Sequence, residues 1–372
     1  MTVPPPVRTP VRLRRFTAGA DEAAVPGTAQ PAHPVSGPAH PVSGPLVDRF
    51  GRVHRDLRLS VTDRCNFRCT YCLPAEGATF RPRSELLDAE ELVRVASVAR
   101  RLGVTALRIT GGEPLVRPRV VELVAGLARL GFEDLALTTN AARLADLARP
   151  LAAAGLHRVN ISCDSLRADR FPTIRRRGNL APVLAGMDAA ESAGLRPIKV
   201  NVVLIRGVNE DEVLAFAAFA RDTGRQVRFI EFMPLDEDHR WERSLVVPAE
   251  EVLRTVNSRW PLLPITEGAD DSAPAVSYRF ADGAPGGIGV VASVTAPFCG
   301  RCDRIRVTAD GAIRNCLFSD DELSLRRLLR SGGSDADLAE LFHRSVGSKR
   351  PGHGMDDPDF LRPRRSMSMI GG

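Results

Sequence analysis

Three cysteines stand close together in the stretch TDRCNFRCTYC, as Cys65, Cys69 and Cys72. A structural zinc ion normally takes four protein ligands, commonly as two separated pairs, and a disulfide would leave one thiol over. A 4Fe-4S cluster takes one thiolate per iron, so three local thiolates leave one iron able to bind a small molecule. The trio therefore favours an iron-sulfur cluster over zinc or a purely structural role.

A second incomplete set follows near the C-terminus, as Cys299, Cys302 and Cys316. By itself it resembles a zinc knuckle that a histidine such as His343 would complete. Two incomplete sets in one chain are better explained by two clusters, each with a ligand-binding iron. Arg304 and Arg306 alternate on a short β-type run, so both face one way and are suited to grip an anionic ligand. The alternative is a pair of solvated arginines on an edge strand.

Composition limits the partners and the compartment. The chain has 372 residues, a formal net charge of +6 and only two lysines, Lys199 and Lys349. Scattered arginines with few aromatics suit a small phosphate-bearing ligand better than nucleic acid. No apolar run is long enough to span a bilayer and no secretory signal is present, which predicts a cytoplasmic protein with no membrane partner. In such a reducing compartment, clustered thiols are more often metal ligands than disulfides.

The elements that must position these residues follow a regular order. Residues 1–45 are rich in proline, alanine and glycine, repeat the unit PAHPVSG, and are expected to be a disordered leader. Six β-type runs then alternate with helical patterns, and the first helix is marked by a capping box from Asp88 to Glu91. The six runs are residues 57–61, 104–110, 135–139, 158–163, 198–204 and 227–232.

Six strand-helix units predict a parallel sheet with right-handed crossovers, closed either as a doubly wound sheet or as a full or partial barrel. Unusual polar residues follow almost every strand, which is typical of the rim of a barrel rather than of one switch point. We therefore predict an α/β fold: an incomplete (β/α)6 TIM-type barrel at residues 46–265. Residues 266–372 would form a C-terminal extension that carries the second cluster and covers the open side.

The cysteine motif CxxxCxxC, with an aromatic residue before the third cysteine and GGEP after the next strand, resembles the radical S-adenosylmethionine (SAM) enzymes. In that family the open iron chelates SAM, and a 5'-deoxyadenosyl radical then removes hydrogen from the substrate. The resemblance implies that Cys65, Cys69 and Cys72 hold the SAM cluster. It also implies SAM contacts from Tyr71, Gly112, Ser162 and Met233.

The rest of the chain is similar to the radical SAM enzymes of molybdenum cofactor biosynthesis, through LTTN, IKVNVV, FIEFMP, the second cysteine set and a terminal IGG. This resemblance implies conversion of GTP to (8S)-3',8-cyclo-7,8-dihydroguanosine 5'-triphosphate, the first step of molybdopterin synthesis. It implies an auxiliary 4Fe-4S cluster on Cys299, Cys302 and Cys316 that binds guanine. Gly371 and Gly372 would form a catalytic tail. The implied GTP contacts are Arg58, Arg108, Thr138, Lys199, Arg304 and Arg306.

The resemblance also implies partners: a one-electron donor such as flavodoxin, cyclic pyranopterin monophosphate synthase downstream, and a homodimer as one possible assembly. The sequence departs from the family at Ala106, where lysine is common, and at Cys163, which strand alternation predicts to be a small buried core residue. Two alternatives remain open at this point. One is a peptide-modifying radical SAM enzyme with two clusters, and the other is a zinc-stabilised binding module without catalysis.

Overall fold

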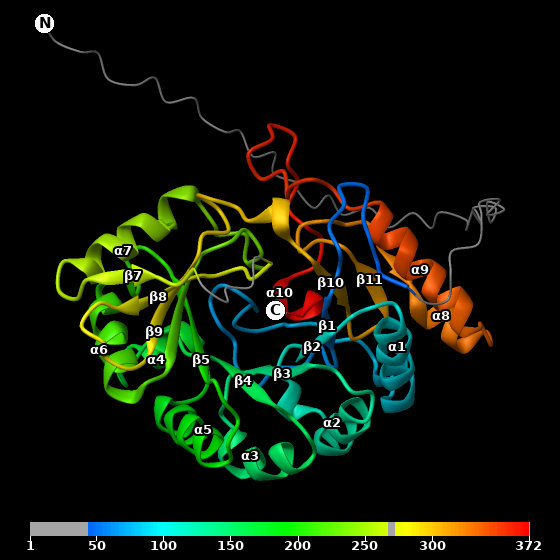
Figure 1. Cartoon of the computed structure of the whole chain (residues 1–372), viewed down its shortest axis with the longest axis horizontal. Coiled ribbons are helices and arrows are strands. Elements are labelled where there is room, and N and C mark those ends of the chain that lie inside the picture. The colour runs from blue at the N-terminus through cyan, green and yellow to red at the C-terminus, as the bar shows by residue number, and fades with distance from the viewer. Residues whose placement is uncertain (1–43, 267–271, 372) are drawn as a thin grey trace, which may run out of the picture. The chain divides into compact units, whose positions relative to one another are not determined.

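The structure is a computed structural model that describes residues 44–266 and 272–371. Its centre is a run of six parallel strands in which each pairs with the next, as predicted. The strands are β1 (Asp56–Ser60), β2 (Ala106–Thr110), β3 (Asp134–Thr139), β4 (Arg158–Ser162), β5 (Lys199–Leu204) and β6 (Gln226–Glu231). The strands bend into a curved wall, and the C-terminal helix lies on its inner side (Figure 1).

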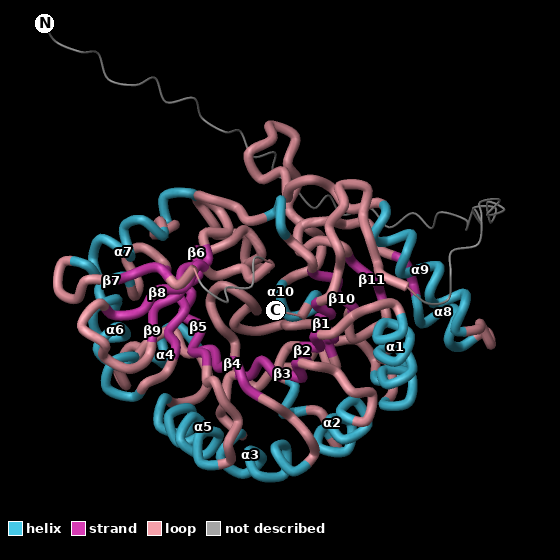
Figure 2. The backbone as a smooth tube through the Cα atoms, in the orientation of Figure 1, coloured by secondary structure: helices cyan, strands magenta, loops and turns pink. Residues whose placement is uncertain are grey.

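Helices follow the strands and cover the outer face of this wall (Figure 2). The predicted capping box is present at the first helix, where Asp88 accepts from the Glu91 backbone N–H and Glu91 accepts from that of Asp88. Gly224 has φ 71 and closes the helix that precedes β6, in the left-handed conformation that glycine adopts most readily. The helices are α1 (Ala89–Arg101), α2 (Val120–Ala128), α3 (Leu144–Ala153), α4 (Phe171–Arg175), α5 (Leu180–Ser192), α6 (Val213–Thr223) and α7 (Ala249–Asn257).

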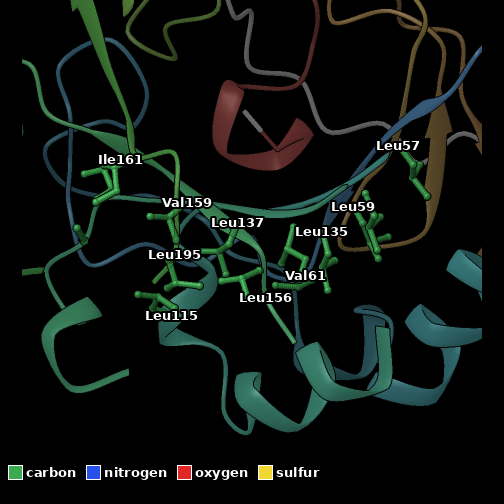
Figure 3. Close-up of a cluster of buried hydrophobic side chains, with 14 of the residues drawn as sticks. Leu57, Leu59, Val61, Leu115, Leu135, Leu137, Leu156, Val159, Ile161 and Leu195 are labelled. Carbon is green, nitrogen blue, oxygen red and sulfur yellow. The ribbon is translucent and has the colours of Figure 1, made fainter. Parts of the chain in front are cut away.

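The core lies between the strands and these helices, where leucine, valine and isoleucine from alternate strand positions are buried. Leu57, Leu137 and Ile161 are each 0% exposed and belong to one hydrophobic cluster, part of which Figure 3 shows. Burial of one such side chain stabilises the fold by roughly 1.5–3 kcal/mol. Because side chains alternate along a strand, the residues between these positions face the inside of the curve.

The C-terminal extension does more than cover an open side, because it continues the sheet at both edges. β10 (Arg304–Val307) pairs parallel with β1, and β9 (Gly287–Val291) pairs parallel with β6, so eight described strands run parallel. Outside these eight, β11 (Ala312–Arg314) pairs antiparallel with β10 and β8 (Val276–Phe280) pairs antiparallel with β9. The edge strands β12 (Leu323–Ser324) and β7 (Leu262–Pro264) pair antiparallel with β11 and β8. The predicted six-stranded barrel is therefore confirmed as the core of a larger mixed sheet that stays open between β12 and β7.

Three further helices complete the extension: α8 (Leu325–Arg330), α9 (Asp335–Gly347) and α10 (Met367–Ile370). α10 lies inside the curve of the sheet, close to the labels of β1 and β10 in Figure 1. Of the predicted leader, residues 1–43 lie outside the described part of the chain. The predicted boundary between residues 265 and 266 remains a prediction.

Candidate active site

Both cysteine trios line one cavity of about 290 Å³. Its wall is drawn from all eight parallel strands, from the loop that carries the first trio, and from the stretch between β9 and β12. Cys65 and Cys316, which are 251 positions apart in the sequence, therefore line the same cavity. The sheet brings them together because β10 pairs directly with β1.

Strand alternation explains which side chains reach the cavity. On β1 and β2, Leu57 and Leu107 face the helices, while Arg58 and Arg108 pair in register and line the cavity. Arg304 and Arg306 on β10 also line the cavity, and Arg306 pairs in register with Arg58. The inner face of the curved sheet therefore carries polar side chains at these positions, and its outer face carries apolar ones.

The GGEP motif holds the loop that carries the first trio. The backbone N–H of Gly112 donates to the Thr62 carbonyl at 2.7 Å, and that of Glu113 donates to the Arg64 carbonyl at 2.8 Å. A Cβ on Gly112 would lie 2.5 Å from the Arg64 carbonyl oxygen, which leaves no room for a side chain. The 1% exposed carboxylate of Glu113 accepts from the Thr139 hydroxyl at 2.7 Å, which ties the motif to β3.

The first trio has the chemistry of a cluster site rather than of a single-metal site. Burial raises the pKa of the Cys65 thiol to about 12 and that of Cys72 well above its ordinary value, with further contributions from the neighbouring cysteines. Metal coordination deprotonates such thiols. Among the described residues, no three Cys, His, Asp or Glu side chains converge as they would on one metal ion. Thiolates that each bind a different iron of a cluster need no such convergence.

The second trio lies in a more electropositive setting. Burial alone would raise the pKa of Cys302, but Arg304 and Lys349 lower it to about 7. The Lys349 ammonium, 3% exposed, donates to the Cys302 sulfur at 3.4 Å and to the Arg304 carbonyl at 2.8 Å. A thiol that ionises near neutral pH is a ready metal ligand. Both trios therefore fit iron-sulfur clusters.

The arginines of the cavity are crowded and incompletely paired. Burial and mutual repulsion lower the pKa of Arg58, that of Arg228 to about 9 and that of Arg306 to about 10. The Nε atoms of Arg58 and Arg108 are buried without a hydrogen-bond partner among the described residues. Buried cations without enough partners indicate a site for an anionic ligand.

Most of the predicted site residues line this cavity. They are Cys65, Cys69, Cys72, Cys299, Cys302, Cys316, Tyr71, Gly112, Ser162, Met233, Arg58, Arg108, Thr138, Arg304 and Arg306. Lys199 is absent from the lining, although it stands on β5 two residues before Asn201, which does line the cavity. Gly371 is also absent from the lining, but its carbonyl accepts from Arg306 Nη1 at 2.9 Å. Gly372 lies outside the described residues.

Gly371, the last residue that the structure describes, packs beside the cavity against Ser60 and Thr110. A Cβ on Gly371 would lie 2.6 Å from the Thr110 hydroxyl, so glycine fits closely here. Two α10 residues, Met367 and Ser368, line the cavity, and Ile370 is 1% exposed. The described part of the tail is thus buried beside an arginine of the site.

Sequence reasoning missed several cavity residues. Arg228 on β6 and Arg175 at the end of α4 both line the cavity, and strand alternation could have found Arg228. Arg175 has no such signal, because its position depends on how α4 packs. Arg228 adds a cation to the cavity wall, whereas Ala106, the first residue of β2, is absent from it.

Two other expectations can be checked. Cys163 is 0% exposed on the helix-facing side of the sheet, so its predicted role as a core residue is confirmed. His343 lies on α9 and is not part of the cavity wall. The histidine named for a zinc knuckle is therefore not beside the second trio, although another histidine, His353, lines the cavity there.

Comparison with known families agrees with this geometry. The family model of the radical SAM superfamily matches residues 59–220, and that of Molybdenum Cofactor Synthesis C matches residues 225–355. The chain is thus a radical SAM enzyme of the class that acts in molybdenum cofactor biosynthesis, with SAM and iron-sulfur clusters as cofactors.

Curated relatives specify the class further. The GTP 3',8-cyclase of Corynebacterium glutamicum is 47% identical over 337 residues, which cover 88% of this chain and 89% of that protein. The GTP 3',8-cyclase of Streptomyces coelicolor is 46% identical over 88% of this chain and 96% of its own. The chain belongs to the GTP 3',8-cyclase family. This membership decides against both the peptide-modifying enzyme and the non-catalytic zinc module.

Solved structures confirm the fold. SuiB of Streptococcus suis, bound to its precursor peptide SuiA, has a TM-score of 0.56 at 12% identity, over 81% of this chain and 69% of that one. The protein anSMEcpe with bound AdoMet has a TM-score of 0.52 at 14% identity, over 80% and 81% of the two chains. In the part of the chain that the structure describes, no helix is long and apolar enough to cross a bilayer.

Proposed function

We propose that this chain converts GTP to (8S)-3',8-cyclo-7,8-dihydroguanosine 5'-triphosphate, the first step of molybdenum cofactor biosynthesis. The observation that carries the proposal is that two cysteine trios and a set of underpaired arginines line one cavity. A radical reaction needs its cofactor and its substrate side by side, and this cavity provides one space for both.

Cys65, Cys69 and Cys72 hold the first cluster in this proposal, and Tyr71 contacts the SAM bound to it. The other SAM contacts are Gly112, Ser162 and Met233, all of which line the cavity. Bound together, the cluster and SAM supply the one-electron chemistry that removes the 3' hydrogen atom of the substrate ribose. The backbone at Gly112, held by Thr62 and without a side chain, leaves room for a ligand to approach closely.

The arginines bind and orient GTP. Arg58, Arg108 and Arg306 carry charge that burial and repulsion between neighbouring arginines make costly, so a polyphosphate relieves repulsion when it binds. Arg304 stays charged beside Cys302 and Asp56, which raise its pKa. Thr138 adds a hydroxyl from β3, and Lys199 reaches the ligand from β5. Guanidinium forks clamp phosphate oxygens in a fixed geometry, which converts binding into orientation of the ribose.

Cys299, Cys302 and Cys316 would hold the auxiliary cluster, which would supply a binding site for the guanine base. The bond from Arg306 to the Gly371 carbonyl supports a catalytic role for the tail, with Gly371 and Gly372 reaching into the site beside the substrate. A flavodoxin-type donor supplies electrons, and cyclic pyranopterin monophosphate synthase consumes the product. The protein works in the cytoplasm, with a homodimer as one assembly open to it.

The test is direct. The anaerobically reconstituted and reduced protein is incubated with GTP and SAM, and the products are separated by chromatography and identified by mass. The proposal predicts 5'-deoxyadenosine together with a cyclised nucleotide of the same mass as GTP. Formation of 5'-deoxyadenosine with unchanged GTP would contradict the proposed substrate.

A further inference from the structure

One buried cation contacts the first cysteine trio directly. Arg175 closes the short helix α4, is 2% exposed, and donates from Nη1 to the Cys69 sulfur at 3.0 Å. It takes no part in the proposed chemistry, and no feature of the sequence marks it out among the many arginines of the chain. A hydrogen bond from a cation to sulfur stabilises negative charge on that sulfur.

The guanidinium is fixed by a second buried charge. Asp164 lies 2.9 Å from Arg175 Nη2, is 1% exposed, and accepts from the Tyr71 hydroxyl at 2.7 Å. The other oxygen of the Asp164 carboxylate accepts from the Val203 backbone N–H at 2.9 Å. The chain of contacts thus runs from Cys69 through Arg175 and Asp164 to Tyr71, the residue between the last two cysteines of the trio.

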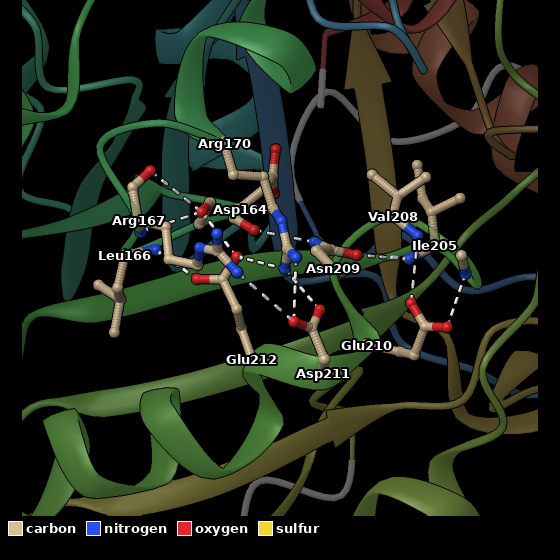
Figure 4. A network of polar contacts seen from close by, with 12 residues as sticks. Asp164, Leu166, Arg167, Arg170, Ile205, Val208, Asn209, Glu210, Asp211 and Glu212 are labelled. Carbon is tan, nitrogen blue, oxygen red and sulfur yellow. Dashed lines mark hydrogen bonds and ion pairs between the residues drawn. The ribbon is translucent and has the colours of Figure 1, made fainter.

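Asp164 itself cannot easily turn away. The side-chain amide of Asn209 donates to the Asp164 carbonyl at 2.8 Å and to the Val203 carbonyl at 2.9 Å (Figure 4). Asn209, in the loop after β5, therefore connects that loop to Asp164 at the end of β4. Asp164, the counterion of Arg175, is thus held at its carboxylate by Val203 and at its carbonyl by Asn209.

The surroundings of Arg175 strengthen its charge effect. The guanidinium carbon lies 5.8 Å from the centre of the Phe67 ring, 6.0 Å from that of Tyr71 and 5.7 Å from that of Phe171. Aromatic walls exclude water, so the charge is screened less than it would be at the surface. The Nε and Nη2 atoms are buried without a hydrogen-bond partner among the described residues, so Nη2 contacts Asp164 as an ion pair only.

α4 also holds the cysteine loop through its backbone. The N–H of Arg68 donates to the Arg175 carbonyl at 3.0 Å, and that of Thr70 donates to the Ile174 carbonyl at 3.0 Å. Both donors flank Cys69 in the sequence. Position and charge at this cysteine are therefore controlled from the same end of one helix.

We propose that Arg175 is a positioning residue that raises the reduction potential of the first cluster through the Cys69 sulfur. This inference rests on the proposed function, in which Cys69 is a cluster ligand. When the cluster takes up one electron from the external donor, going from the 2+ to the 1+ state, it gains one negative charge. A buried cation bonded to a ligand sulfur stabilises that added charge. Asp164 offsets part of this effect and fixes its direction.

The test is a reductive titration of the full-length reconstituted protein, followed by EPR at the lines that change when SAM is added. Arg175→Met removes the charge and the donor. We expect it to lower the equilibrium constant for one-electron reduction about tenfold, which corresponds to a potential about 59 mV more negative. Arg175→Gln keeps a hydrogen-bond donor without the charge, and we expect its reduction potential to lie between those of the wild type and Arg175→Met. Arg175→Lys keeps the charge and should retain most of the wild-type potential.

Arg177→Met is the matched control. It removes the same positive charge as Arg175→Met, but from an exposed residue two positions along the chain. It is expected to leave the potential unchanged. Iron content and thermal unfolding establish that each variant is loaded and folded, and if Arg175→Met loses iron, the comparison of Arg175→Gln with Arg175→Lys decides.

A loaded, SAM-responsive Arg175→Gln or Arg175→Met protein with the wild-type potential would overturn the inference and leave the proposed function standing. A shift in Arg177→Met as large as that in Arg175→Met would also overturn it, because bulk charge would then be the cause. A wild-type protein without any SAM-responsive signal would instead contradict the proposed function.

Discussion

At the scale of single residues, the site is organised by charge that the fold concentrates and does not neutralise. Arg58 and Arg108 stand in register on neighbouring strands, and each has a buried Nε without a partner among the described residues. Alternation along the predicted strands was sufficient to place these side chains on one face. It could not reveal Arg175 or Lys349, because their contacts with sulfur depend on packing between distant segments.

Lys199 predicts a pH dependence of GTP binding. Burial, with repulsion from Arg228, Arg158 and Arg108, lowers its pKa to about 7. Phosphate favours the charged ammonium, so the pKa must be higher in the complex, and affinity should be greatest below pH 7. Above pH 7, the affinity for GTP should fall by up to about tenfold per pH unit. Calorimetry measures this affinity.

Lys199→Arg is the control, because a guanidinium stays charged over this range. Its profile should lack the extra decline above pH 7, once the titration of the nucleotide common to both proteins is subtracted. Parallel profiles for the two proteins would remove Lys199 from the set of GTP contacts.

Cysteine substitution separates ligands from core. Cys69→Ala should lose about half of the bound iron, because one of two clusters loses a thiolate. Cys163→Ala should keep all of it, since Cys163 is buried on the opposite face of the sheet. The measurement is iron content after anaerobic reconstitution. Equal iron loss in both variants would show that destabilisation, not ligation, is responsible.

At the scale of elements, the sequence predicted the six central strands and their order, since each is an apolar run followed by a helical pattern. β9 and β10 were missed as members of the parallel sheet, because no crossover helix of the βαβ kind announces them. β10 was recognised as a short β-type run, but pairing with β1 brings together residues from opposite ends of the described chain. Such long-range pairing leaves no local pattern to detect.

Gly112 predicts how tightly GGEP and the cysteine loop fit. Gly112→Ala places a Cβ within 2.6 Å of the carbonyl oxygens of Asp63 and Arg64, so the loop must move. We expect a loss of about 1–3 kcal/mol in the free energy of unfolding, together with weaker SAM binding. Denaturant titration and SAM binding measure the two effects.

Gly347→Ala is the matched control for this substitution, since a Cβ there meets nothing within 4 Å and the residue ends helix α9. It should be neutral or slightly stabilising in the same denaturant titration. Equal stability and SAM affinity in both variants would contradict the close approach of GGEP to the loop.

At the scale of the whole molecule, the C-terminal part of the described chain lies against its first strand. β10 pairs with β1, and the Gly371 carbonyl accepts from Arg306 on β10. The terminal IGG was singled out by resemblance alone, because a glycine end ordinarily frays. The structure gives it a physical setting, with Ile370 and Gly371 buried among residues of the first strands.

Removal of residues 371–372 should abolish cyclisation and leave iron content and thermal unfolding unchanged, because the tail contributes contacts at the site rather than to the core. Chromatography of the nucleotides and iron analysis of the same sample provide both readouts. Unaffected turnover in the truncated protein would count against a catalytic tail.

The central claim is that the two cysteine trios place SAM and GTP in one cavity, with the ribose 3' carbon facing the radical source. GTP deuterated at the 3' position tests this most directly, through mass spectrometry of the 5'-deoxyadenosine formed. The account predicts that this product carries the deuterium and that unlabelled GTP gives none. Cyclised nucleotide formed alongside 5'-deoxyadenosine without deuterium would contradict it.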